Sequence, residues 1–175
     1  AGDGANQHPT QTLLDLFSIR DSQGKLDNIS LGIMGDLKFS RTVHSLVEAV
    51  KLFNMKLYFI APKPLRMSDE QLLELQAAGI NYSFHNTLEE VVGELDCLYL
   101  TRLQKERFLD EEIVDSYKIT MHNLNDVRPN LKILHPLPRR EELPVEIDAT
   151  PYAYYFQQAQ NGLYVRQALL DILFT

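Results

Sequence analysis

The chain has 175 residues, of which 45% are hydrophobic and 23% charged, and its formal net charge is −7. This length and composition predict one globular domain with a well-buried core and exclude a disordered chain. The negative charge argues against nucleic acid as a partner, because the basic residues occur singly around predicted loops. A membrane partner is not expected either, since no apolar run approaches the roughly 18 residues that a spanning helix needs.

The chain begins at Ala1 without an initiator methionine, inside a glycine-rich turn, as though it were cut from something longer. The polar first dozen residues do not resemble a signal peptide, which predicts a cytoplasmic location. The single cysteine, Cys97, has no partner for an internal disulfide. We expect it to pack as a small hydrophobic residue.

Helical and strand patterns alternate from the first helix onward. Pro9 can occupy the first turn of a helix that runs to about Arg20, with His8 at or near its cap. Short apolar runs predict the strands, and capping-box sequences predict two of the helices. The elements expected next are a strand at 29–34, a helix at 42–53, a strand at 56–61, a helix from Ser68 to about Gly79, a strand at 81–85, a helix from Thr87 and a strand at 96–101.

The pattern weakens in the charged stretch 105–115, which we interpret as a surface helix or loop. A short strand follows at 131–134, and prolines stiffen its exit at 135–139. A long helical pattern interrupted by Gly162 covers 152–174. The alternation predicts the α/β class, as one Rossmann-like domain with a parallel sheet of about five strands flanked by helices.

Basic residues concentrate where predicted strands end. Ligands of a parallel α/β sheet bind beyond the carboxyl ends of its strands, so this pattern predicts a site for small anions. Seven of the 17 Lys and Arg residues lie in three such windows: Lys38, Arg41, Arg102, Lys105, Arg107, Arg139 and Arg140.

The window after residue 34 does not fit a dinucleotide turn, because the spacing Gly32-x-x-Gly35 departs from G-x-G-x-x-G. Arg41, at the entry of the next helix, can offer a two-pronged donor to a carboxylate or phosphate. The alternative is a surface arginine paired with a carboxylate. His44, one turn on, is interpreted as a structural or supporting histidine.

Three further groups could contact a ligand. Arg102 and Gln104 point the same way if the strand conformation continues, so they could hold an amino acid's carboxylate. His8 and Gln11 lie about one helical turn apart and share a face, although a lone histidine is usually structural. The proline-rich exit at 135–138 presents backbone carbonyls that could accept from an NH₂ group.

Four motifs, in this order, resemble the aspartate carbamoyltransferases. They are Asn6-Gln7-His8-Pro9-Thr10-Gln11, Gly35-Asp36-Leu37-Lys38 with Arg41-Thr42-Val43-His44-Ser45, Thr101-Arg102 with Gln104-Lys105-Glu106-Arg107, and His135-Pro136-Leu137-Pro138-Arg139. The resemblance runs the length of the chain but covers only the carboxyl-terminal, aspartate-binding half of such an enzyme. It implies that residues 1–20 form an interdomain-type helix with carbamoyl phosphate contacts, that 21–150 form the aspartate-binding domain, and that 151–175 form a helix packed on the absent amino-terminal half.

The resemblance also implies roles at carbamoyl phosphate. His8 would be the catalytic residue, donating a hydrogen bond to the carbonyl oxygen of carbamoyl phosphate. Gln11 and the backbone carbonyl of Leu137 would hold its NH₂ group, with Pro138 beside them. No metal or cofactor is required by this acyl transfer, in which the developing oxyanion must be stabilised.

For the second substrate, the resemblance implies that Arg41 and Arg102 grip the two carboxylates of L-aspartate and that Gln104 places its amine for attack. Enzymes of this kind work as homotrimers, with or without regulatory chains. Their phosphate-gripping residues lie in the half that is absent here, so this chain alone is expected to be inactive.

Two alternatives remain open at this stage. Ornithine carbamoyltransferases resemble the chain in fold, but they typically carry a cysteine-bearing loop where this sequence has 135–139, so aspartate is favoured. The other alternative is a noncatalytic module that binds a dicarboxylate or serves as an assembly element.

Overall fold

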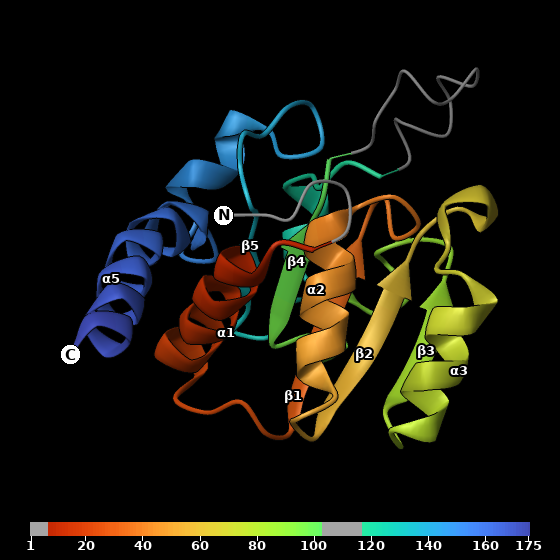
Figure 1. Ribbon diagram of the computed structural model, residues 1–175. Coiled ribbons are helices and arrows are strands. Elements are labelled where there is room, and N and C mark those ends of the chain that lie inside the picture. The colour runs from red at the N-terminus through yellow and green to blue at the C-terminus, as the bar shows by residue number, and fades with distance from the viewer. Residues whose placement is uncertain (1–6, 103–116) are drawn as a thin grey trace.

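A computed structural model describes residues 7–102 and 117–175 of the protein (Figure 1). Its centre is one sheet of five parallel strands in the order β3-β2-β1-β4-β5. The strands are β1 (Ile29–Met34), β2 (Met55–Ile60), β3 (Asn81–His85), β4 (Cys97–Leu100) and β5 (Lys132–Leu134). The predicted class and the five-strand parallel sheet are confirmed, and the strand order is that of doubly wound Rossmann-like sheets.

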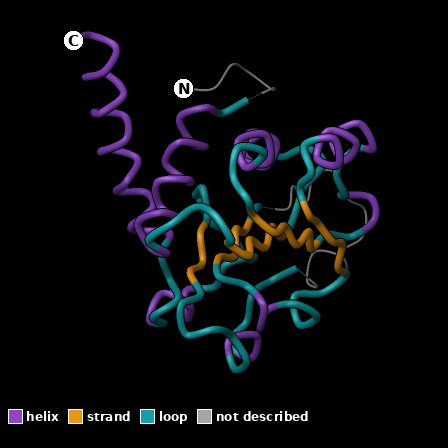
Figure 2. The backbone as a smooth tube through the Cα atoms, turned by 90° about the horizontal axis from the view of Figure 1, so that it is seen from below, coloured by secondary structure: helices purple, strands orange, loops and turns teal. Residues whose placement is uncertain are grey.

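Helices cover one face of the sheet more than the other. The helices are α1 (Pro9–Gln23), α2 (Arg41–Val50), α3 (Asp69–Ala77) and α5 (Tyr155–Phe174). Figure 2 shows α1, α2 and α3 along one face, whereas loops and short helical turns line the opposite face. Helix α5 packs beside α1, and its carboxyl-terminal end extends away from the body of the domain (Figure 2).

The sheet is buried between these two layers, which explains the apolar runs in the sequence. All four residues of β4 are buried, and β1 and β2 each have one residue that is not. Strands of parallel sheets that are covered on both faces read as continuous hydrophobic segments. Cys97 lies among them as predicted, and burial raises the pKa of its thiol to about 12, so the thiol stays protonated and inert.

The prediction of a helix that begins at Thr87 is wrong. Residues 86–91 form turns, followed by the short 3₁₀ helix Val92–Glu94. The chain must cross here from the edge strand β3 past β2 and β1 to β4, three strand spacings of about 4.8 Å, while returning along the sheet. An α-helix gains only about 1.5 Å per residue. Eleven residues therefore span the crossover better as turns, and Glu90 instead accepts from the Asn86 backbone N–H at 3.3 Å.

Other expectations are settled by the packing. The capping box at Ser68–Gln71 is present. Gly162 does not interrupt α5, because the helix continues through it and a Cβ there would lie 3.2 Å from Leu14 of α1. The predicted surface segment 105–115 lies outside the described residues. Within the parts of the chain that the structure describes, no helix combines the length and hydrophobicity needed to cross a membrane.

Candidate active site

The site is built at the carboxyl ends of β1 and β4, which are adjacent although β2 and β3 separate them in sequence. The connections leave these two strands in opposite directions, which opens the crevice where ligands of such sheets bind. Gly35, directly after β1, has a φ of +120°, and a Cβ on it would lie 2.5 Å from both the carbonyl and the hydroxyl oxygen of Thr101. The close approach of the two strand ends therefore requires a glycine.

Asp36 turns the chain from β1 into α2. It is buried, and its Oδ1 accepts from the backbone N–H groups of Lys38 at 3.1 Å and Phe39 at 2.8 Å. Its own N–H donates to the hydroxyl of Thr101 at 3.0 Å, which ties this turn to the end of β4. The turn delivers Arg41 to the first position of α2, where the helix dipole also favours an anion.

His8 lies at the N-cap of α1, as predicted, with Pro9 in the first turn. The buried Nδ1 of His8 has no hydrogen-bond partner among the described residues. Burial, and next the positive charge of Arg41, lowers the pKa of His8. The imidazole is therefore neutral near pH 7, so it can donate a hydrogen bond to a ligand oxygen without carrying a charge of its own.

Ser45 joins the start of α1 to the start of α2. Its hydroxyl accepts from the backbone N–H of His8 at 2.8 Å and donates to the carbonyl of Arg41 at 2.9 Å. This bridge brings together two predicted site residues that are separated by β1. His44, the neighbour of Ser45, forms a 3.0 Å hydrogen bond with the Leu37 carbonyl, which supports the structural role predicted for it.

Arg102 follows the buried Thr101 at the end of β4 and is half-buried. The Thr101 N–H donates to the Met34 carbonyl at 2.9 Å, so the start of the loop that carries Arg102 is fixed to the end of β1. Arg41 and Arg102 thus leave the two sides of the crevice, as a ligand with two carboxylates would need. Gln104 lies outside the described residues, and so do Lys105 and Arg107.

Gln11 belongs to a buried polar cluster around Asp15. One oxygen of Asp15 accepts from the side-chain amides of Gln11 at 2.8 Å and Gln158 at 2.7 Å, and the other accepts from the Tyr99 hydroxyl at 2.9 Å. Burial raises the pKa of Asp15 to about 7, although these three hydrogen bonds favour the ionised form. The cluster joins α1, β4 and α5.

The exit of β5 is held by His135. Its Nδ1 accepts from the Leu137 N–H at 2.8 Å, so its Nε2 carries the proton and donates to Glu142 at 3.0 Å. Burial alone would raise the pKa of Glu142, but hydrogen bonds from His135 and the backbone hold that pKa below its usual value. Leu137 has a φ of +50° and a cis peptide bond to Pro138. The predicted contact Leu137 is held in this segment by its hydrogen bond to His135.

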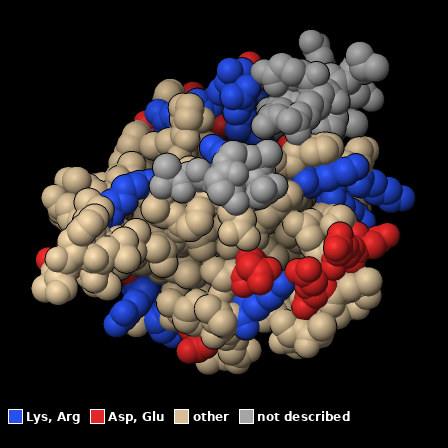
Figure 3. All heavy atoms as spheres, viewed as in Figure 1, with Lys and Arg blue, Asp and Glu red and all other residues tan. Residues whose placement is uncertain are grey.

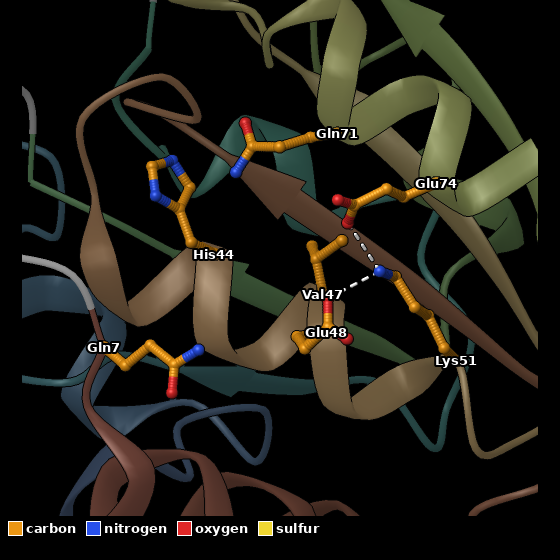
Figure 4. A pocket seen from close by; sticks show the side chains of 7 residues that line it. All are labelled: Gln7, His44, Val47, Glu48, Lys51, Gln71 and Glu74. Atoms are coloured by element: carbon orange, nitrogen blue, oxygen red, sulfur yellow. Dashed lines mark hydrogen bonds and ion pairs between the residues drawn. The ribbon is translucent and has the colours of Figure 1, made fainter.

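Two other groups of charged residues prove structural. Arg139 forms a two-pronged ion pair with Asp148, at 2.7 Å for one pair of atoms, so its predicted place in an anion site is not supported. A hollow of about 490 Å³ lies between α2 and α3 (Figure 4), but the lysine in it, Lys51, pairs with Glu48 at 2.5 Å and Glu74 at 2.8 Å. The hollow holds none of the predicted site residues and offers no uncompensated positive charge.

Figure 3 shows the charge distribution on the face seen in Figure 1. Many Lys and Arg side chains lie near the upper edge, where the strands end, and others lie lower, whereas the largest group of acidic side chains lies over α2 and α3. In residues 7–102 and 117–175, no group of three or more His, Cys, Asp or Glu side chains is arranged to hold a metal ion.

No role was predicted for four residues of the site: Asp15, Ser45, Tyr99 and Gln158. Asp15 and Gln158 are polar residues on helices, a pattern that normally indicates a solvated face, yet both are almost fully buried. A signal was available for Asp15, which lies four residues after Gln11 on the same helix face. None was available for Gln158, whose partner is 143 residues away.

Comparison with known proteins assigns the family. The family model described as "Aspartate/ornithine carbamoyltransferase, Asp/Orn binding domain" matches residues 27–173. The chain therefore belongs to the aspartate/ornithine carbamoyltransferase family, and the matched part is its Asp/Orn-binding domain. Within the family it is similar to aspartate carbamoyltransferase catalytic subunits, at 56% identity for that of Photobacterium profundum and 54% for subunit 2 of Shewanella halifaxensis. The alignments cover 98% and 99% of this chain, respectively, and 57% of each relative.

Solved structures agree with this assignment. The catalytic subunit of M. jannaschii aspartate transcarbamoylase has a TM-score of 0.92 and 44% identity, covering 97% of this chain and 56% of that one. The Trypanosoma cruzi enzyme in complex with carbamoyl phosphate and aspartate has a TM-score of 0.89 and 35% identity, covering 97% and 56%. The chain thus spans somewhat more than half the length of the relatives it matches.

Proposed function

We propose that this chain is the aspartate-binding part of an aspartate carbamoyltransferase, an enzyme of de novo pyrimidine biosynthesis. The whole enzyme transfers the carbamoyl group of carbamoyl phosphate to the amine of L-aspartate and yields N-carbamoyl-L-aspartate and phosphate. The observation that carries the proposal is the junction of His8 and Arg41 through the Ser45 hydroxyl at the switch point of the sheet. In this proposal, His8 acts as the neutral hydrogen-bond donor and Arg41 as the cation that binds a carboxylate.

The proposed chemistry follows from these groups. The neutral amine of aspartate attacks the carbonyl carbon, the new C–N bond forms, the C–O bond to phosphate breaks, and the proton that the amine loses leaves with the phosphate. His8 donates to the carbonyl oxygen as negative charge develops there, and Gln11 and the Leu137 carbonyl hold the NH₂ group. Arg41 and Arg102 fix the two aspartate carboxylates. Preorganised donors of this kind typically contribute on the order of 10²-fold in rate each.

Further partners are proposed on the same basis. The relatives are longer than this chain, and we infer that the remaining part supplies the grip on phosphate. The exposed apolar residues of α5 support docking of that part on this helix, since Ile172 is 76% and Phe174 85% exposed. Leu13 and Phe17 of α1 are also more than 40% exposed. A homotrimer, with or without regulatory chains, and a cytoplasmic location complete the proposal.

The test measures carbamoyl transfer to aspartate or to ornithine, by this chain alone and mixed with a separately produced amino-terminal part of the enzyme. Turnover of aspartate in the mixture but not by the chain alone is expected. Turnover of ornithine instead would assign the sister activity. An assembled mixture that binds aspartate without turnover would favour a noncatalytic binding module, and turnover by the chain alone would refute the divided phosphate site. The mass of the assembled protein measures the oligomeric state.

A further inference from the structure

Both proposed contacts to the NH₂ group of carbamoyl phosphate, Gln11 and Leu137, belong to one buried hydrogen-bond network. We propose that Asp15 is a positioning residue that fixes the orientation of the Gln11 side-chain amide, so that Gln11 presents its oxygen and selects a ligand bearing NH₂. This inference rests on the proposed function and adds a determinant of substrate specificity that does not touch the substrate.

The orientation of the amides follows from a group whose chemistry is unambiguous. The backbone N–H of His135 can only donate, and it donates to Gln158 Oε1 at 2.7 Å. The Gln158 amide is therefore turned with its NH₂ group toward Asp15, at 2.7 Å from Oδ1. The oxygen and nitrogen of Gln158 are thus assigned by a backbone group and not by choice between two similar atoms.

Asp15 in turn fixes the orientation of the Gln11 side-chain amide. An ionised carboxylate only accepts hydrogen bonds, and Asp15 already receives them from Gln158 and Tyr99. The Gln11 group facing it at 2.8 Å must then be the NH₂ group. The oxygen of the Gln11 amide is left without a partner among the described residues, as an acceptor for a ligand NH₂ group.

The same network reaches the second contact. His135, whose N–H is tied to Gln158, also accepts from the Leu137 N–H at 2.8 Å through Nδ1. The backbone that carries the Leu137 carbonyl and the amide of Gln11 are therefore linked through Gln158 and Asp15. A buried network holds its members in one arrangement. If Asp15 no longer accepts hydrogen bonds, the side chains bonded to it must therefore change their orientation.

Protonation of Asp15 leaves the orientation of the Gln11 amide unchanged. Asp15 is faced by Gln11 from α1, Gln158 from α5 and Tyr99 from β4, and of these Tyr99 titrates. Burial, followed by the nearby charge of Asp15, raises the pKa of Tyr99 well above its usual value, so its hydroxyl remains a donor. A protonated Asp15 can carry its proton on the oxygen that faces the Tyr99 hydroxyl, which can also accept, so the other oxygen still accepts from both amides.

The experiment uses the complete enzyme and compares carbamoyl phosphate with acetyl phosphate, in which a methyl group replaces NH₂. In Asp15→Leu the acceptor that both glutamine amides face is lost, and the Gln11 oxygen can turn inward to accept from the Gln158 NH₂ group. The preference for carbamoyl phosphate over acetyl phosphate is expected to fall about ten- to hundredfold, as for loss of a buried hydrogen bond. Affinity for acetyl phosphate should change little.

Tyr99→Phe is the matched control, because it removes one hydrogen bond from Asp15 and leaves both amides as they are. Its preference should equal that of the unaltered enzyme. If Asp15→Leu does not fold, the smaller Asp15→Ala removes the same acceptor and should also lower the preference. In the unaltered enzyme the preference should stay constant as the pH falls through about 7, because the proton taken up by Asp15 can lie on the oxygen that faces Tyr99.

Two results overturn the inference: an Asp15→Leu enzyme whose preference stays within threefold of the original, or one that loses both ligands equally. They are distinct from failure of the proposed function. If the unaltered complete enzyme does not prefer carbamoyl phosphate at all, the proposed function fails, whatever the variants do.

Discussion

Substitution of Gly35 tests whether the crevice requires the close approach of the ends of β1 and β4. Its φ of +120° lies in a region that side chains rarely adopt, and a Cβ would lie 2.5 Å from two oxygen atoms of Thr101. One of these oxygens belongs to the backbone, so the contact cannot be relieved by rotating a side chain. Gly35→Ala should therefore lower the free energy of unfolding by about 1–3 kcal/mol for the backbone conformation and by about 1–3 kcal/mol for the overlap.

Gly24→Ala is the matched control. Gly24 also has a positive φ, +74°, but no atom lies within 4 Å of the position of its Cβ. The expected loss there is about 1–2 kcal/mol, from the left-handed conformation alone. Urea unfolding of this chain, followed by circular dichroism, measures both variants against the original.

The greater loss of stability expected for Gly35→Ala should be accompanied by weaker binding of aspartate. Relief of the overlap must move Thr101, and Arg102 is the next residue. In the complete enzyme the variant should thus raise the KM for aspartate, whereas Gly24→Ala should leave it unchanged. If Gly35→Ala is no more destabilising than Gly24→Ala, or if it leaves aspartate binding intact, the argument that this approach builds the crevice is refuted.

Three further outcomes are expected. In the complete enzyme, Arg41→Ala and Arg102→Ala should raise the KM for aspartate at least tenfold more than that for carbamoyl phosphate, and an equal rise in both would contradict the assignment of these arginines to the aspartate carboxylates. Replacement of His8 by alanine should lower kcat on the order of 10²-fold with the fold preserved by circular dichroism, and an unchanged kcat would remove His8 from the oxyanion contact. The third outcome concerns Asp15, which has a pKa of about 7 in the folded protein against a usual value of 3.8. The folded state then binds the extra proton between these values, so the stability contributed by Asp15 falls as the pH rises from about 4 to 7, by up to about 4 kcal/mol. Urea unfolding across this range should show a steeper decline in the original chain than in Asp15→Asn, and identical slopes would exclude the raised pKa.

Much of the fold could be predicted because its helices and strands depend on apolar, turn and capping residues that lie close together in the sequence. The bounds of β1 agree with prediction, since a strand buried on both faces is apolar throughout. Those of the partly exposed edge strand β3 also agree, because polar and aromatic residues alternate along it. The failure at Thr87 shows the limit of the same reasoning. A capping-box sequence describes a local preference, whereas the distance that the crossover must span is a property of the whole sheet.

The candidate site likewise has features that could be predicted from the sequence and features that could not. Sequence patterns were enough to predict which residue types can contact an anion or an amide, and that they lie at strand ends and helix starts, because these features depend on chain direction and spacing. Three-dimensional packing was needed to show that β1 and β4 are neighbours, that Ser45 joins His8 to Arg41, and that Asp15 contacts Gln158 across 143 residues. Such contacts depend on how the layers pack, and burial turns the polarity of one carboxylate into a constraint on its neighbours.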